Sequence, residues 1–283
     1  MLFFSSPPRL GILLLTLLLV SGALSSVGAF EATFFDLPEG EAILIKSQGR
    51  WILIDAGPAI ACDRLLRGLK DRGVRELDYL IVTHPHPDHY SGIFCLTGFL
   101  YPRRLADNGQ KIPPFPQDDF LRWYATWRQK HPRYRFLSAG ETLKIGEIVI
   151  QVLWPPSLSG NYNADSLVLM VKEKKGRLLL TGDIPASVEK TLVEDYGSGL
   201  RAQVLKVSHH GAADASSEVF LKYVSPQVAV VCAGRNHPRG YPAKRVLERL
   251  KRLVPQVLVT GDQGTLSVVI SPSGEVQWRS YNE

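Results

Sequence analysis

The 283-residue sequence lacks the features that define several classes of protein. Its three cysteines, Cys62, Cys95 and Cys232, are too few for a disulfide framework. Each lies in an apolar stretch, so we expect small core residues, although one pair could oxidise outside the cell. With 45% hydrophobic and 21% charged residues, the chain is not disordered, collagenous or a coiled coil. The length fits one large globular domain or two small ones.

Long apolar runs are also scarce, and the one that is present covers residues 10–20. Arg9 precedes it and small residues follow as far as Ala29, a pattern typical of a secretory signal cut after Ala29. The run is shorter than the roughly 20 apolar residues of a spanning helix, and an uncleaved anchor is the alternative. We therefore predict a signal peptide over 1–29 and a globular domain over 30–283. The protein would be secreted or periplasmic, meeting a membrane only if the segment stays uncleaved.

The same order of elements occurs twice along the predicted domain. In the first half, strands at 41–46 and 51–55 lead to Asp55, a helix near 60–69, and a strand at 78–83 that ends in histidines. In the second half, strands at 166–171 and 177–181 lead to Asp183, a helix at 186–196, and a strand at 203–207 that ends in His209 and His210. Further alternating strands and helices follow. We expect an α/β fold, a four-layer αββα sandwich of two similar halves, with its site at the carboxyl ends of strands.

Residues 101–137 interrupt this plan. They hold eight basic and three acidic residues, and a helix is predicted from Asp118 with Phe120, Trp123, Tyr124 and Trp127 at helical spacing. The stripe either packs on the body or forms a lid that grips a substrate. His131, which has no companion ligands here, is expected to face solvent. A net charge of +6 for the chain suits an anionic substrate without requiring one.

The most informative stretch is His84-Pro85-His86-Pro87-Asp88-His89, which directly follows a predicted buried strand. In an extended loop His84 and His86 project the same way and can hold one ion, while Asp88 and His89 can serve a second. Imidazole and carboxylate together suit Zn, Mn or Fe.

Further candidate ligands end other strands. A carboxylate at Asp183 can bridge two metal ions, and His209 or His210 supplies another imidazole. Asp55 matches Asp183 in the first half. It is expected to orient a ligand, because metal-binding histidines usually donate their second N–H to such a group.

At these residues the chain resembles the metallo-β-lactamase-fold hydrolase superfamily, and within it the C-terminal hydrolase domain of the competence proteins of DNA uptake. The resemblance runs from about Phe30 to the end and includes the motifs at 35–42, 53–57, 83–89, 163–169, 181–183 and 205–211. It implies two divalent metal ions, Zn or Mn. The ligands would be His84, His86 and Asp183 for one ion, and Asp88, His89, Asp183 and His210 for the other, with His210 favoured over His209 by the resemblance.

Two positions depart from the superfamily pattern. Asn163 stands where the broad superfamily has histidine, as it does in the competence group, which argues against a β-lactamase or a glyoxalase II. Tyr241, in Gly240-Tyr241-Pro242, stands where the competence group usually has histidine, and Asn236 and His237 lie just upstream as substitutes. The channel of the competence proteins is absent from this sequence.

We expect two-metal hydrolysis of a phosphodiester by a metal-activated water, with Asp88 at the catalytic centre. His209, Asn163 and His237 or Tyr241 would bind the phosphoryl oxygens. Single-stranded DNA is the favoured substrate, and no stable protein partner is implied. The alternatives are a cell-envelope phosphodiesterase, for example on phosphocholine with the tryptophans as a cation–π cage, and a metal-binding module without catalysis.

Overall fold

The computed structural model describes residues 30–113 and 118–281, and the predicted signal peptide lies outside these ranges. Two sheets form the centre. The eight-stranded first sheet has the order β15-β14-β1-β2-β3-β4-β5-β6, with β1 Phe30–Phe34, β2 Ile43–Ser47, β3 Arg50–Ile54, β4 Tyr79–Ile81, β5 Leu105–Asp107, β6 Tyr134–Phe136, β14 Thr265–Ile270 and β15 Val276–Tyr281. The seven-stranded second sheet has the order β13-β12-β11-β10-β9-β8-β7, with β7 Thr142–Ile145, β8 Ile148–Trp154, β9 Val168–Glu173, β10 Gly176–Leu180, β11 Val204–Lys206, β12 Val228–Val231 and β13 Gln256–Val259.

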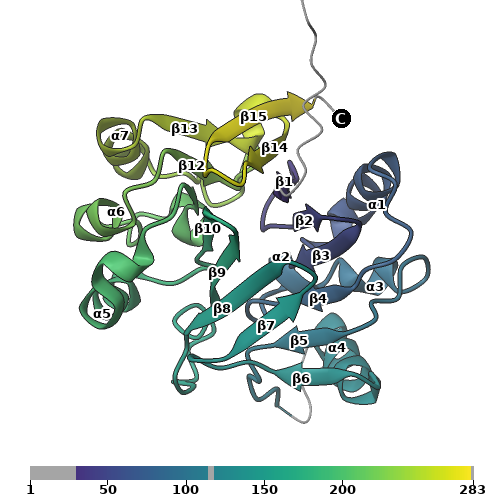
Figure 1. The fold of residues 1–283 in the computed structure, drawn as a ribbon. Helices are drawn as coiled ribbons and strands as arrows, with labels where there is room; N and C mark the ends of the chain where they lie inside the picture. The colour runs from purple at the N-terminus through teal and green to yellow at the C-terminus, as the bar shows by residue number, and fades with distance from the viewer. Residues whose placement is uncertain (1–29, 114–117, 282–283) are drawn as a thin grey trace, which may run out of the picture.

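Helices cover the outer face of each sheet, which gives four layers (Figure 1). The helices are α1 Cys62–Asp71, α2 Pro87–Tyr90, α3 Ile93–Leu96, α4 Asp119–Lys130, α5 Ala186–Tyr196, α6 Glu218–Val224, α7 Lys244–Leu253 and α8 Thr260–Gln263. The first four lie with the first sheet, and α5, α6 and α7 cover the second. Within the described ranges, no helix has the length and apolar character needed to cross a bilayer. The predicted αββα sandwich is confirmed.

Apolar residues on both faces of the central strands explain this layering. In β3, Ile52 and Ile54 belong to the core between the two sheets, whereas Leu53 between them belongs to the core beneath the helices. Successive side chains of a strand point to opposite faces, so a strand that is apolar throughout must be covered on both sides. The runs of Ile, Leu and Val therefore predict central strands.

The predicted repetition of elements is present in the structure. In the first half, the β2–β3 hairpin precedes α1, and β3 lies parallel to β4. In the second half, the β9–β10 hairpin precedes α5, and β10 lies parallel to β11. Because parallel strands present their carboxyl ends at one edge, Asp55, the His84–His89 stretch, Asp183 and the 209–210 histidines follow strands at that edge.

The segment of residues 101–137 is part of the layers and does not form a lid. Residues 101–137 contribute β5 and β6 to the first sheet, and α4 packs on that sheet. Tyr124 is fully buried, and the rings of Trp123 and Trp127 stack with centroids 5.5 Å apart against the same core. The stripe at helical spacing is thus a packing face, the first of the two interpretations above. The lid does not form because the strands beside α4 extend an existing sheet.

Two further expectations are corrected by the structure. His131 is buried, not solvent-facing, because its Nε2 lies 3.0 Å from the carbonyl of Pro102 and its ring stacks on Tyr101. Cys62 and Cys95 are joined in a disulfide between α1 and α3 and so are more than core filler, whereas Cys232 is a free, buried core residue.

A buried ion pair fastens α4 to the first sheet. Arg128 donates from Nη1 to Asp107 Oδ2 at 2.6 Å and from Nη2 to the carbonyl of Gln110 at 2.7 Å. Tyr124 and Tyr134 donate their hydroxyls to the two oxygens of the same carboxylate. The Arg128 and Asp107 side chains are only 8% and 2% exposed, so each depends on its partner.

We predict that Arg128→Ala destabilises the protein by about 3 kcal/mol, because it leaves the Asp107 carboxylate buried with no cation. Urea unfolding followed by circular dichroism measures the change. Arg122→Ala on the same helix is the control. The Arg122–Asp119 pair is exposed, so we expect a change of about 0.5 kcal/mol or less. Equal effects of the two substitutions would contradict the prediction.

Candidate metal centre

The His84–His89 stretch runs from the end of β4 into α2. His86 is the extended residue before the helix, and Pro87 occupies its first turn, where a missing N–H does no harm. Asp88 and His89 then lie within that short helix and are both buried. Gly40 allows this arrangement, because a Cβ at its position would lie 1.8 Å from the carbonyl oxygen of Asp88.

Asp55 fixes the orientation of two groups in this stretch. Its carboxylate accepts the backbone N–H and the hydroxyl of Thr83, both at 2.7 Å, and the Nδ1–H of His89 at 2.8 Å. Because the Thr83 hydroxyl gives its only proton to Asp55, it can only accept from His84 Nδ1 at 3.1 Å. His84 and His89 therefore both carry their proton on Nδ1. Asp55 has the orienting position that the sequence predicts.

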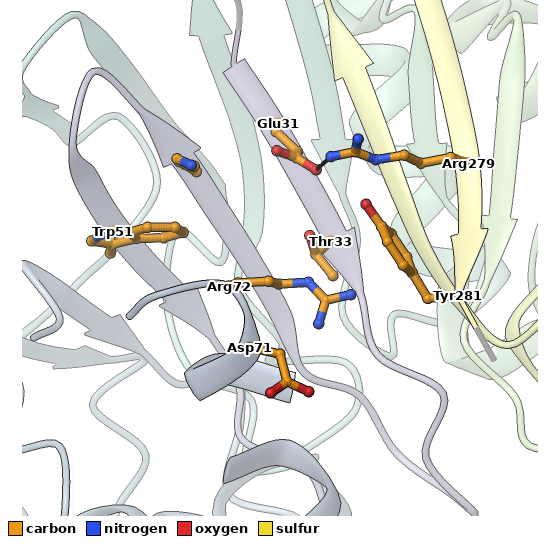
Figure 2. A pocket seen from close by; sticks show the side chains of 8 residues that line it. Glu31, Thr33, Trp51, Asp71, Arg72, Arg279 and Tyr281 are labelled. Atoms are coloured by element: carbon orange, nitrogen blue, oxygen red, sulfur yellow. Dashed lines mark hydrogen bonds and ion pairs between the residues drawn. The ribbon is translucent and has the colours of Figure 1, made fainter. Parts of the chain in front are cut away.

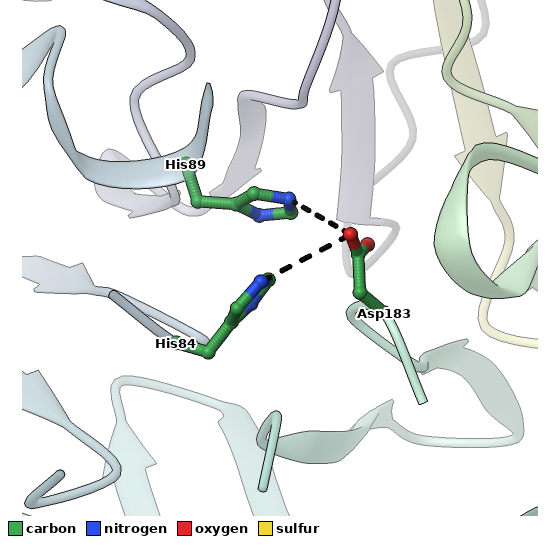
Figure 3. Close-up of side chains that lie close together, drawn as sticks. All are labelled: His84, His89 and Asp183. Carbon is green, nitrogen blue, oxygen red and sulfur yellow. Dashed lines mark ion pairs between the residues drawn. The ribbon is translucent and has the colours of Figure 1, made fainter. Parts of the chain in front are cut away.

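Asp183, which follows β10 of the second sheet, meets these imidazoles (Figure 3). Its Oδ2 lies 3.4 Å from Nε2 of His89 and 3.9 Å from Nε2 of His84. Ligand atoms of all three residues lie within 4.8 Å of one another, and all three residues are buried. The carboxylate is placed by its own backbone N–H, which donates to Ser166 Oγ at 3.1 Å.

A second group consists of Asp88, His89 and His210, again with ligand atoms within 4.8 Å of one another. His210 lies in a one-turn segment after β11 at φ 54°, a left-handed conformation that non-glycine residues seldom adopt. Its Nδ1–H donates to the carbonyl of Cys232 at 2.9 Å, which leaves Nε2 facing Asp183 Oδ2 at 3.3 Å and Asp88 Oδ2 at 3.7 Å.

The other histidines of the two motifs lie at the margin of these groups. His209 is less deeply buried than His210, and its Nε2 lies 3.8 Å from Asp183 Oδ2. His86 is half-buried, and its Nδ1 lies 2.9 Å from Nε2 of His84, with Tyr162 beside its ring. Neither histidine belongs to a group of candidate ligands in the described part of the chain.

The predicted substrate-binding residues divide into two sets. His237 is buried, and its ring lies 5.7 Å from that of His210 and 4.9 Å from that of Tyr241. Its Nδ1 accepts the backbone N–H of Arg239, so its Nε2–H is a buried donor without a partner. Asn236, in contrast, is exposed and lines a cavity of about 400 Å³ that none of the candidate metal ligands lines.

Asn163 occupies a loop held by Asp165, whose carboxylate accepts the backbone N–H groups of Ser159 and Gly160. The side-chain oxygen of Asn163 is buried and has no hydrogen-bond partner. An unpartnered polar atom in an ordered loop is available to a ligand, although it cannot replace an imidazole as a ligand of soft divalent metals.

Sequence reasoning missed an ion pair beneath the site. Lys206 and Glu41 are fully buried and pair with each other, and Lys206 Nζ also lies 3.6 Å from Asp183 Oδ1. Lys206 donates to the carbonyl of Gly182 at 2.8 Å as well. Lys206 is a lysine inside the apolar strand β11, which is unusual. Because a buried lysine needs an acidic partner, this feature of the sequence could have indicated the ion pair.

The carboxylates and imidazoles of the site shift one another's pKa values in opposite directions. Burial disfavours ionisation of Asp183, but His210 and His89 outweigh it and hold the pKa of that carboxyl well below its usual range. Burial likewise opposes a charge on His89, but Asp183, Asp55 and Asp88 together raise its pKa well above the ordinary value. Three carboxylates around one imidazole form a site that attracts cations.

The residues present fit a divalent metal. Nε2 of His89 and of His210 and Oδ1 of Asp183 are buried atoms with no hydrogen-bond partner. The Nδ1 atoms of His84, His89 and His210 are each engaged as donors, so Nε2 of each ring is the nitrogen left to bind a metal. Imidazoles anchored at one nitrogen and free at the other are the usual arrangement of metal ligands.

Comparison with known proteins agrees with this geometry. Residues 39–235 match the family described as Metallo-beta-lactamase superfamily. Competence protein ComA of Neisseria gonorrhoeae is 30% identical over 275 residues, 95% of this chain and 37% of that protein. ComE operon protein 3 of Bacillus subtilis (strain 168) is 27% identical over 88% of this chain and 34% of that protein. Recombination protein 2 of Haemophilus influenzae is 30% identical over 91% of this chain and 31% of that protein.

The chain thus spans about a third of the length of these curated relatives. Among solved structures, the metallo-beta-lactamase fold protein YhfI from Bacillus subtilis superposes with a TM-score of 0.56 at 13% identity. The superposition covers 89% of this chain and 100% of that one. At this identity the likeness concerns the fold alone.

We predict that Asp55→Asn lowers the affinity for Zn or Mn about 10- to 100-fold, because an amide has one acceptor oxygen where the carboxylate accepts from Thr83 and His89 on two. Competition with a chromophoric chelator measures the affinity. Asp78→Asn is the matched control. Asp78 is also buried, and it accepts the Trp51 backbone N–H next to the amino end of β4, away from the site. An unchanged affinity in Asp55→Asn would contradict the prediction.

Proposed function

The chain belongs to the metallo-beta-lactamase superfamily, and from that premise we propose that it is a metal-dependent phosphodiesterase that cleaves single strands of nucleic acid outside the cytoplasm. The resemblance drawn from the motifs is confirmed by this family and by the competence relatives. The observation that carries the proposal is the set of free Nε2 atoms and carboxylate oxygens in one buried place, beside unpartnered polar groups suited to a phosphoryl oxygen.

We propose that the site holds two divalent ions. His84 and Asp183 would hold one, together with His86 as the sequence suggests, and Asp88, His89, Asp183 and His210 would hold the other. Bound divalent metal supplies Lewis acidity and lowers the pKa of water to near neutrality. Asp183 contributes to both places, because its Oδ2 faces His89 and His210 at similar distances. Lys206 lies 3.6 Å from the carboxylate of Asp183, and Ser166 Oγ fixes its backbone by accepting the N–H.

Other side chains are suited to bind and orient a phosphodiester. The Nε2–H of His237 is a buried donor that points to no protein acceptor, and burial, followed by the nearby His210, lowers its pKa to about 4. A neutral imidazole at this position donates to a phosphoryl oxygen without adding a charge. His209 and Tyr241 lie beside it, with ring centroids 5.6 Å apart, and Asn163 contributes from its loop.

The nucleic-acid substrate is supported by the names of the relatives, which are competence and recombination proteins. The alternative on phosphocholine depended on a cage of free tryptophans. Trp123 and Trp127 stack on each other and pack against the first sheet, so no observation favours that alternative. A metal-binding module without catalysis would need no buried, unpartnered donor such as His237 Nε2.

We predict that the purified chain, loaded separately with Zn and Mn, cleaves both bis-p-nitrophenyl phosphate and labelled single-stranded DNA. Asp88→Ala should abolish both activities, because it removes a carboxylate from the second group. Asp195→Ala is the control at an exposed acidic position. Cleavage of the small diester alone would favour an envelope phosphodiesterase. Two bound metals with no cleavage of either substrate would refute the proposed hydrolysis.

We also predict that His237→Ala lowers kcat for the small diester about 100-fold or more while metal content stays unchanged, because the residue donates to substrate and does not hold metal. Metal analysis of the variant separates the two roles. His131→Ala, at a buried histidine in the loop after α4, is the control. A loss of bound metal in His237→Ala would show that His237 is a ligand.

A further inference from the structure

A groove of about 450 Å³ lies where the edge strands of the two sheets meet. The edge strand of the first sheet is β6 and that of the second is β7, and both contribute to its lining. The residues that define it are Arg104, Arg133, Arg135, Lys144, Tyr79 and Tyr134. The groove begins at the amino ends of β4, β5 and β6, whereas the metal centre lies beyond the carboxyl end of β4.

This groove is lined by charge of one sign. Four cations line it and no carboxylate does. Glu141, just outside, pairs with Arg135 alone. Within the described residues, Arg104, Arg133 and Lys144 are exposed and have no acidic partner within 4.0 Å. Three uncompensated charges side by side repel one another, and a polyanion relieves that repulsion.

The cavity shown in Figure 2 provides a comparison on the same sheet. At about 400 Å³ it is of similar size and also contains cations, among them Arg72 and Arg279. Glu31 and Asp71 accompany them, and Glu31 pairs with Arg279 at 3.1 Å. Carboxylates thus accompany the cations in that cavity, whereas no carboxylate lines the β6–β7 groove.

The β6–β7 groove continues toward the metal centre along β6. Tyr134 and Arg135 line the groove, and the next residue, Phe136, lines a second cavity of about 280 Å³ with Pro155 and Leu158. Phe136 is 63% exposed, which is unusual for a phenylalanine in a strand.

The second cavity ends against the loop that reaches the site. Asn108, which also lines it, donates its side-chain N–H to the carbonyl of Asp165 at 2.9 Å. The same loop carries Asn163 and Tyr162, and the ring of Tyr162 lies 5.5 Å from that of His86. Cations, an exposed aromatic ring and the metal centre therefore follow one another along one edge of the molecule.

Cations followed by an exposed aromatic ring match the chemistry of single-stranded nucleic acid, whose phosphates bind cations and whose bases stack on rings. Resting on the proposed function, we propose that the β6–β7 groove is a docking site for a nucleic-acid strand. Arg104, Arg133 and Lys144 bind its phosphates, Phe136 stacks on a base, and the strand continues to the metal centre.

The test reverses the three unpaired charges in Arg104→Glu/Arg133→Glu/Lys144→Glu. The control variant, Arg67→Glu/Arg75→Glu/Lys251→Glu, changes the net charge equally at exposed, unpaired positions on α1, after α1 and on α7. Binding of a fluorescent 20-residue oligothymidylate is measured by anisotropy between 50 and 300 mM salt. Hydrolysis of bis-p-nitrophenyl phosphate is measured in parallel, and thermal unfolding verifies the fold.

We expect the groove variant to bind the oligonucleotide at least about 10-fold more weakly at 50 mM salt. Its slope of log K against log salt should fall by about 2, since each phosphate contact of a single strand contributes about 0.7. Its hydrolysis of the small diester should stay within about 2-fold of the parent chain. The control variant should lose less than about 3-fold in binding. Phe136→Ala should weaken binding about 5-fold or more for the oligothymidylate and leave an abasic 20-mer unaffected.

Binding to vesicles of 30% phosphatidylglycerol in phosphatidylcholine is measured alongside. Three outcomes would overturn the docking site: unchanged oligonucleotide binding in the groove variant, equal losses of oligonucleotide binding in both charge variants, or a groove variant that loses binding to the vesicles alone. The result for the small diester separates this proposal from the proposed function. If the parent chain binds DNA but hydrolyses no diester, and the groove variant alone loses DNA binding, then the proposed hydrolysis fails and the docking site stands.

Discussion

The carboxylate of Asp183 has to reach imidazoles that belong to the other half of the molecule. It follows β10 of the second sheet, while His84 and His89 follow β4 of the first. Two stacked sheets lie about 10 Å apart, so only residues just beyond the strand ends can meet across the gap. The apolar core between the sheets fixes this separation, and the positions of the loops around the site follow from it.

The same place concentrates charge that the fold must neutralise. Asp55, Asp88, Asp183 and Glu41 are all buried within this region, and each would repel the others. Lys206 neutralises part of this negative charge, because it pairs with Glu41 and lies 3.6 Å from Asp183. The remaining carboxylates stabilise a positive charge on the imidazoles. They raise the pKa of His89, although burial alone would lower it. A divalent cation that displaced that proton would relieve the same repulsion.

Local pattern was sufficient for the layers and for most of the residues that gather at the site, although His86 lies outside the groups of candidate ligands in the described residues. His84 and Asp183 each come directly after a strongly apolar run that predicts a buried strand. Polar residues that follow parallel strands gather at the carboxyl edge of the sheet. The left-handed turn at His209 and His210 has no local signature, and it places Nε2 of His210 closer to Asp183 than Nε2 of His209.

Contacts between distant residues could not be predicted in the same way. Glu41 and Lys206 pair across 165 positions, and no periodicity connects them. His131 was expected to face solvent because it has no companion ligands nearby in the sequence, whereas the carbonyl of Pro102 and the ring of Tyr101 bury it. The pairing of Cys62 with Cys95 depends on α1 and α3 packing together.

The placement of residues 101–137 changes how a substrate reaches the centre. A lid would close over the metal ligands and admit a small molecule. Instead β5 and β6 widen the first sheet, and their edge lies beside β7 of the second. Arg128 and Asp107 neutralise each other inside this extension, whereas Arg104 and Arg133 at the groove have no acidic partner within 4.0 Å among the described residues. A long anionic chain can lie along such an edge, while a compact diester contacts only the centre. The proposed polymeric substrate is therefore consistent with both the geometry and the charge of this extension.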